Sequence, residues 1–146
     1  MSAQPSPEAR QDYNALLDAL MPFAEQMLKQ HGEFFPFGAA INPAGEVTAH
    51  AAADGSEQPP SEELIALLVQ GLQAEARAGK IRAAGICYDG RIVQDGKKVD
   101  AVILTLEHNS GNATKTCVPY KKGFFGKYSF GQLIASLEEP KIFVNP

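Results

Sequence analysis

The chain has few of the features that mark a disulfide-rich or membrane-spanning protein. Its two cysteines are too few for a disulfide framework, and they predict reduced thiols in a cytoplasm. No apolar run approaches the length of a membrane span. Residues 1–5 contain neither the basic nor the apolar segment of a secretion signal. We therefore expect a cytoplasmic protein with no membrane partner.

Acidic residues are missing from a long part of the C-terminal half. No Asp or Glu occurs between Glu107 and Glu138, whereas several lysines do. The first 63 residues carry ten acids and two bases, and the formal net charge of the whole chain is -4. Such asymmetry can steer an anionic partner, although overall acidity argues against general nucleic-acid binding. The alternative is an acidic helix surface and a basic strand surface that serve no partner.

The histidines and cysteines do not have the spacing of a metal centre or of a nucleophilic site. His31, His50 and His108 are far apart, and neither C-x-x-C nor H-x-x-x-H occurs. Cys87 and Cys117 lie inside predicted strands, where a thiol is typically buried and has no basic neighbour to activate it. No serine lies in a G-x-S-x-G sequence. We predict no catalytic residue, no metal and no cofactor.

A long helix is predicted near the N-terminus. Ser6-Pro7-Glu8 is typical of a helix start, with a capping hydroxyl, a proline and an acid in the first turn. Apolar residues from 13 to 28 follow at helical spacing, and Gly32 suits the helix end. Pro22 interrupts this stripe and should kink or split the helix, because proline lacks the N–H that the helix requires.

Turn signals and apolar runs predict that most of the remaining chain is extended. Residues 42–45 and Asp95-Gly96 have the composition of tight turns. A second helix is expected from Ser61 to about Gly79, a short third helix from Ser129 to Leu137, and an edge strand over 141–144. The other predicted strands span residues 35–41, 46–52, 81–93, 98–108 and 113–121.

This order of elements, αββαβββα, predicts an α+β fold. One antiparallel sheet of about five strands, a hairpin plus a three-strand meander, would carry the helices on its faces. Residues 99–104 are apolar on both faces, which indicates an inner strand. Residues 1–146 would form a single domain, with residues 1–6 a flexible N-terminus. The topology resembles the roadblock or profilin-like arrangement, but topology does not carry function.

Residues 31–38, His-Gly-Glu-Phe-Phe-Pro-Phe-Gly, place three phenylalanines where the first helix meets the first strand. Aromatic residues are common on recognition surfaces, so a ligand pocket with His31 and Glu33 as its polar groups is one hypothesis. The other is a buried hinge that fixes the angle between the helix and the sheet. Glu107 and His108, at the end of a predicted strand, are further ligand-binding candidates because they could form an acid–base pair with a partner across the sheet.

Residues 119–128 interleave cations with aromatic rings. Tyr120, Lys121, Lys122 and Lys127 are candidates for contact with an anion or with single-stranded nucleic acid. The glycines and the lysine do not have the spacing of a phosphate-binding loop. An ordinary loop that packs a phenylalanine under a lysine stem is the alternative.

Four stretches resemble parts of small bacterial proteins whose function is not established: residues 27–38, 86–89, 106–108 and 118–121. The resemblance implies a bacterial cytoplasmic protein and carries over no functional residue. We expect a non-enzymatic interaction module that binds another protein, or itself as a dimer, through a sheet edge or a helix face. Two alternatives stay open. One is an enzyme or small-ligand-binding protein with a pocket near His31–Phe37, and the other binds single-stranded nucleic acid through residues 121–127.

Overall fold

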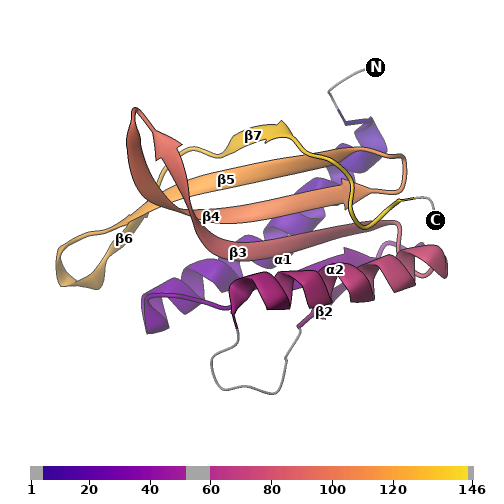
Figure 1. Ribbon diagram of the computed structural model, residues 1–146, viewed down its shortest axis with the longest axis horizontal. Coiled ribbons are helices and arrows are strands. Elements are labelled where there is room, and N and C mark those ends of the chain that lie inside the picture. The colour runs from indigo at the N-terminus through magenta and orange to yellow at the C-terminus, as the bar shows by residue number, and fades with distance from the viewer. Residues whose placement is uncertain (1–4, 52–59, 145–146) are drawn as a thin grey trace.

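The computed structural model describes residues 5–51 and 60–144, which form one antiparallel sheet with a helix on each face (Figure 1). The predicted α+β class is confirmed. The predicted flexible N-terminus, residues 1–6, lies mostly outside the described residues. The elements are α1 (Pro7–His31), β1 (Phe37–Ile41), β2 (Val47–His50), α2 (Ser61–Arg77), β3 (Ala83–Gln94), β4 (Lys97–His108), β5 (Ala113–Lys122), the short helix η1 (Phe124–Gly126), β6 (Tyr128–Phe130) and β7 (Ile134–Leu137).

The described sheet has seven strands in place of the five expected, in the order β2-β1-β3-β4-β5-β6, with β7 also paired to β5. Helix α2 connects β2 to β3 and brings β3 alongside β1, where Phe37 pairs with Cys87. Strands β3 and β4 are 12 residues each and form the longest ladder. β4 lies between β3 and β5, so its expected position as an inner strand is confirmed.

The predicted short helix over residues 129–137 is wrong, and two strands take its place. Tyr128 and Phe130 point to the same side of β6 and pack on Tyr120 of β5, a period-two pattern that favours a strand. Gly131 breaks the run, and its N–H donates to the carbonyl of Pro119 at 2.7 Å. The edge of β5 that faces away from β4 pairs with β6 and with β7, and this pairing satisfies the backbone groups of both strands. The expected edge strand over 141–144 is also wrong, because that segment is not a strand.

Helix α1 begins and ends where the sequence predicts. The Ser6 hydroxyl accepts a hydrogen bond from the Ala9 N–H at 3.2 Å. Gly32 adopts a left-handed conformation with φ 77°, and its N–H donates to the Leu28 carbonyl at 2.8 Å. The helix does not split at Pro22, which lies on its exposed side. Helix α2 starts at Ser61, although its N-cap residue is Pro60, which has no side-chain oxygen to accept a bond.

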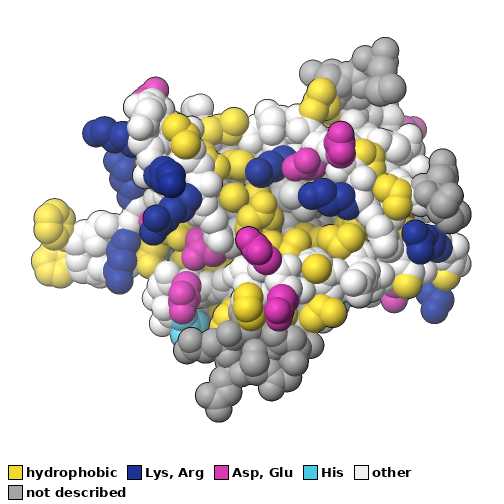
Figure 2. All heavy atoms as spheres, in the orientation of Figure 1, with side chains coloured by type: hydrophobic (Ala, Val, Ile, Leu, Met, Phe, Trp, Pro, Cys, Tyr) yellow, Lys and Arg dark blue, Asp and Glu magenta, His cyan; other side chains and the backbone are white. Residues whose placement is uncertain are grey.

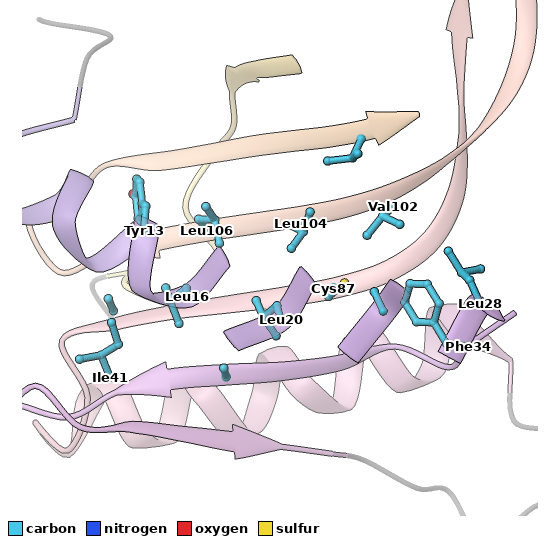
Figure 3. Packing of buried hydrophobic residues seen from close by; sticks show 14 of the residues in the cluster. Tyr13, Leu16, Leu20, Leu28, Phe34, Ile41, Cys87, Val102, Leu104 and Leu106 are labelled. Carbon is cyan, nitrogen blue, oxygen red and sulfur yellow. The ribbon is translucent and has the colours of Figure 1, made fainter. Parts of the chain in front are cut away.

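The main core lies between α1 and the sheet. Figure 3 shows leucines of α1 facing apolar side chains of the central strands. The packing is tight at Gly85, where a Cβ atom would lie 3.0 Å from Leu20 and 2.9 Å from Leu106. A second cluster joins α2 to the opposite face and includes Ile142, which is 1% exposed. Both cysteines are free and buried, as the sequence predicts. Within the described residues, no helix is long and apolar enough to cross a membrane.

Candidate functional site

Glu107 is a buried carboxylate that anchors the C-terminal segment. It lies on the α2 side of β4 and is 4% exposed. Its Oε1 atom accepts three backbone hydrogen bonds, from Lys141 at 3.0 Å, Ile142 at 2.8 Å and Phe143 at 3.2 Å. These bonds satisfy a charge that would otherwise be costly to bury, and they hold Ile142 in the second core cluster. The carboxylate is therefore committed to bonds within the chain.

His108 belongs to a buried polar cluster on the opposite face of the sheet. Its Nε2 atom lies 3.2 Å from Oδ2 of Asp12, on α1. Arg82 binds the same carboxylate at two points, with Nε 3.0 Å from Oδ2 and Nη2 2.9 Å from Oδ1. The hydrogen bonds that Arg82 donates to the Asp12 carboxylate raise the pKa of the guanidinium above its ordinary value. This bidentate pair ties the first turns of α1 to the start of β3.

The cluster continues to Ser110 and so has the residue types of a serine hydrolase triad. The Ser110 hydroxyl lies 2.9 Å from Nδ1 of His108, but the Ser110 N–H also donates to that atom at 3.2 Å. The Gly111 N–H donates to the His108 carbonyl at 3.0 Å. These two amides are therefore already engaged and are not available to an oxyanion. The arrangement is better suited to fixing the β4–β5 turn than to catalysis.

Asp12 and Arg82 were not singled out from the sequence. One signal was available for Asp12, which precedes Leu16 by about one helical turn and so falls beside the buried stripe of α1. No comparable pattern marks Arg82, because its partner is 70 residues away. Among the described residues, no group of three or more His, Cys, Asp or Glu side chains is placed to hold a metal ion.

The joint between α1 and β1 is a partly buried hinge. Phe34 is buried, and the Phe37 ring packs on Phe34 at 5.8 Å and on Phe23 at 4.9 Å. Phe35 is 52% exposed, so one of the three expected hinge rings faces solvent. Both polar residues of the joint, His31 and Glu33, are exposed.

The structure does not gather the four ligand-binding candidates into one pocket. Burial is the main cause that raises the pKa of Asp89, on β3. The negative charge of Glu33 also raises it, so Glu33 lies near Asp89. Asp89 pairs with Val102, and Glu107 lies five residues further along β4, about 17 Å away at the usual rise per residue. Glu107 and His108 also face opposite sides of the sheet. The four candidates therefore do not share one pocket.

Among the cavities of the described residues, two lie between α1 and the sheet, and neither is lined by a predicted site residue. A cavity of about 400 Å³ lies between α1 and strands β4, β5 and β7, with Tyr13 and Thr116 in its wall. The Tyr13 hydroxyl donates to Oδ1 of Asn112 at 2.6 Å, and burial raises its pKa. A more apolar cavity of about 510 Å³ lies between α1 and strands β1 and β2, beside Phe23 and Val47.

The β5–β6 hairpin projects from one end of the molecule (Figure 1). Its base is a cluster of aromatic rings, with centroids 5.9 Å apart for Tyr120 and Tyr128 and 6.5 Å apart for Tyr128 and Phe130. The Tyr120 hydroxyl donates to Oδ1 of Asp89 at 2.6 Å. Tyr120 is 8% exposed, so this predicted contact residue anchors the hairpin to the body instead of facing a partner.

The tip of the hairpin carries two phenylalanines in water. Phe124 is 89% and Phe125 is 100% exposed. Figure 2 shows hydrophobic side chains at the far end of the projection, with basic side chains beside them. Phe125 adopts φ 63° and ψ 25°, a left-handed conformation that is rare for a bulky side chain. The turn is closed by the Gly123 N–H, which donates to the Lys127 carbonyl at 2.6 Å. Lys121, Lys122 and Lys127 are exposed, as their predicted contact role requires.

No protein-family model, curated protein or solved structure matches this chain. Function must therefore be inferred from the geometry of the chain itself. The projecting tip is the feature that needs an explanation, because a folded chain seldom leaves two adjacent phenylalanine side chains almost wholly in water. Phe124 and Phe125 were missed as site residues, although their place between Gly123 and Gly126 in a basic loop was visible in the sequence.

Proposed function

We propose that the chain is a non-enzymatic interaction module that docks on its partner through the tip of the β5–β6 hairpin. The observation that carries this proposal is the near-complete exposure of Phe124 and Phe125. Aromatic side chains supply much of the energy of protein recognition when a partner removes them from water. We place docking at this tip in preference to a sheet edge or a helix face, the surfaces expected from the sequence.

The hairpin is built to present its tip in a fixed direction. The rings at its base and the bond between Tyr120 and Asp89 tie it to β3, so little ordering remains to be done on binding. The left-handed backbone at Phe125 supports the same conclusion, since strained conformations tend to persist at functional sites. The partner should be acidic where it meets the tip, because three exposed lysines flank the phenylalanines.

The alternative of a small-ligand enzyme has less support. Its strongest candidate groups are Glu107 and His108. Glu107 binds the backbone of the C-terminal segment and His108 lies against Asp12, so both side chains are already engaged within the chain. A bacterial cytoplasmic source is part of the proposal. It rests on two free, buried cysteines and on the resemblance of residues 27–38 to small bacterial proteins.

Photo-crosslinking in cells of the organism that encodes the chain tests this function. A benzophenone amino acid replaces Phe125 in one variant and Phe35, the exposed ring of the α1–β1 joint, in a matched control. We expect one dominant adduct, of protein or of lipid, from position 125 and not from position 35. The adduct should fade when Lys121, Lys122 and Lys127 are changed to Gln. Equal labelling from both positions, or none from position 125, would contradict the proposal.

A further inference from the structure

We infer that the partner of the hairpin tip is the surface of an anionic lipid bilayer, an inference that rests on the docking role proposed above. The order of side chains along the hairpin matches the order of layers in a bilayer surface. Phe124 and Phe125 lie outermost, where apolar rings would enter the interface. Lys121, Lys122 and Lys127 lie two or three residues behind them, where the anionic headgroups would be.

Basic charge gathers at the same end of the molecule from a second hairpin. Gln94 and Val99, which flank the β3–β4 turn, line a cavity of about 440 Å³ together with Lys121 and Phe130. Lys97 and Lys98 at that turn therefore lie on the tip side of the molecule, where Figure 2 shows several basic side chains. Two acids lie beside them, Asp95 at the turn and Asp100, which pairs with Arg91 at 3.3 Å, so this second hairpin adds only a small net positive charge to that of the three tip lysines. A chain with a formal charge of -4 thus presents a locally basic end to an anionic surface.

A fluid interface suits this tip better than a nucleic-acid strand does. Stacking on successive bases requires rings laid open along a groove. Here the rings that lie along the hairpin, Tyr120, Tyr128 and Phe130, are buried or half-buried against one another. The two free rings occupy a turn of only three residues, η1, which is too short to lay out a row of rings for successive bases. A lipid interface adapts to a convex tip of any shape.

The insertion is shallow. The η1 turn has backbone polar groups that hydrocarbon would leave unsatisfied, so the rings reach the headgroup boundary and the turn stays hydrated. No spanning segment is needed, which is why the lack of a long apolar run does not bear on this mode of contact. Binding should be reversible and salt-sensitive, since each lysine near an anionic surface contributes about a fivefold gain in partitioning.

Tryptophan fluorescence gives a direct test, because the natural chain contains no tryptophan. The full-length Phe125→Trp variant carries a single reporter at the tip, and Phe35→Trp carries one at the exposed position of the α1–β1 joint, which lies beside the base of the hairpin and not at its tip. Vesicles of phosphatidylcholine alone are compared with vesicles of equimolar phosphatidylglycerol and phosphatidylcholine. We expect a blue shift for Phe125→Trp with the anionic vesicles only, and none for Phe35→Trp with either.

Sedimentation of the natural chain with the same vesicles supplies the binding strength. Lys121→Gln/Lys122→Gln/Lys127→Gln should lower partitioning by about a hundredfold. Phe124→Ser/Phe125→Ser should abolish it, whereas the control Phe35→Ser/Leu137→Ser, which removes two exposed apolar side chains elsewhere, should not. Raising the salt from about 0.1 M to about 1 M should release the chain, because the Debye length falls from about 10 Å to about 3 Å.

The outcomes separate this inference from the proposed function. No binding to anionic vesicles at low salt, or equal binding by the Phe124→Ser/Phe125→Ser variant, would overturn the lipid inference. If position 125 then still crosslinks to one protein in cells, the docking function stands with a protein partner. Binding to a single-stranded oligonucleotide in place of vesicles would also overturn the lipid inference and would favour nucleic acid. Loss of both signals would remove the docking function itself.

Discussion

Glu107 and His108 are adjacent on β4 and hold the two faces of the sheet in different ways. The Glu107 carboxylate accepts three backbone N–H groups of the C-terminal segment on the α2 side. The His108 imidazole lies 3.2 Å from the Asp12 carboxylate on the α1 side. Alternation of side chains along a strand places them back to back, so a single dipeptide fixes one segment on each face.

Replacing Glu107 with Gln should loosen the C-terminal segment. The amide keeps one acceptor oxygen but loses the charge that strengthens all three bonds, so the free energy of unfolding should fall by about 1–3 kcal/mol. Chemical denaturation measures the loss, and hydrogen exchange should quicken at the amides of residues 141–143. Glu139→Gln, at an exposed position of the same segment, serves as the control. Unchanged exchange at those amides would show that Glu107 does not anchor the segment.

Replacing Asp12 with Ala should destabilise the chain by leaving an imidazole and a guanidinium without their carboxylate. We expect a loss of about 1–3 kcal/mol, below that for a fully buried ion pair, because the Arg82 side chain remains partly hydrated. Asp18→Ala on the same helix should change the free energy of unfolding by less than about 0.5 kcal/mol. A double-mutant cycle with Arg82→Ala gives the coupling, and additive effects would contradict a direct interaction.

Ser110 should not behave as a catalytic nucleophile, despite its place beside His108 and Asp12. The Ser110 and Gly111 N–H groups are already donated within the turn, so these two amides cannot serve as an oxyanion hole. We expect no covalent labelling by a fluorophosphonate probe, as read by intact-mass spectrometry. Stoichiometric labelling that disappears in Ser110→Ala would establish a hydrolase and would displace the interaction module as the proposed function.

Asp89 should make the stability of the chain fall as the pH rises through its folded-state pKa. Burial raises that pKa above its ordinary value, so the ionised carboxylate is less favourable in the folded state than in the unfolded state. The stabilising contribution is complete below the unfolded value of about 3.9 and is lost above the raised one. Asp89→Asn keeps an oxygen for Tyr120 and removes the charge, so its stability relative to the natural chain should improve on going from acid to neutral pH.

Denaturation of both proteins over a pH series measures this difference. Asp95→Asn, at the exposed β3–β4 turn, is the matched control, because it removes a carboxylate from the surface of the same pair of strands. A constant difference between Asp89→Asn and the natural chain at every pH would contradict the raised pKa.

Pro22→Ala should stabilise the chain. Proline inside α1 lacks the N–H of the helical ladder, and it lies on the exposed side where its ring adds little packing. We expect the free energy of unfolding to rise by about 1–3 kcal/mol, less than the full propensity difference because the helix has already adapted to the proline. Pro7→Ala, at the first turn where proline is well tolerated, is the control. Destabilisation by Pro22→Ala would show that the proline has a packing role.

Local signals account for most of what the sequence predicts correctly. Gly32, Asp95 and Gly96 need positive φ, and each ends an element where the sequence places the end. The inner position of β4 follows from apolar residues on both of its faces. These features depend on neighbours within a few residues, which a single sequence displays.

Long-range partners explain what the sequence does not predict. Residues 128–137 become two strands because β5 has an unpaired edge, and this edge exists only in the folded sheet. The roles of Glu107 and His108 depend on partners far away in the sequence. Glu107 binds the backbone of Lys141, and His108 lies beside Asp12 near the start of the chain. The importance of Phe124 and Phe125 appears only once their exposure is known.

The hairpin tip and the core differ in how well they should tolerate substitution. The tip closes through its own backbone bond between Gly123 and Lys127, and its rings stay in water. Close to the centre of the sheet, by contrast, Gly85 has no room for a single methyl group between Leu20 and Leu106. Substitutions at residues 124 and 125 can therefore accumulate with little effect on folding, while position 85 stays constrained. Over evolutionary time the same body can acquire a new target by changing only its tip.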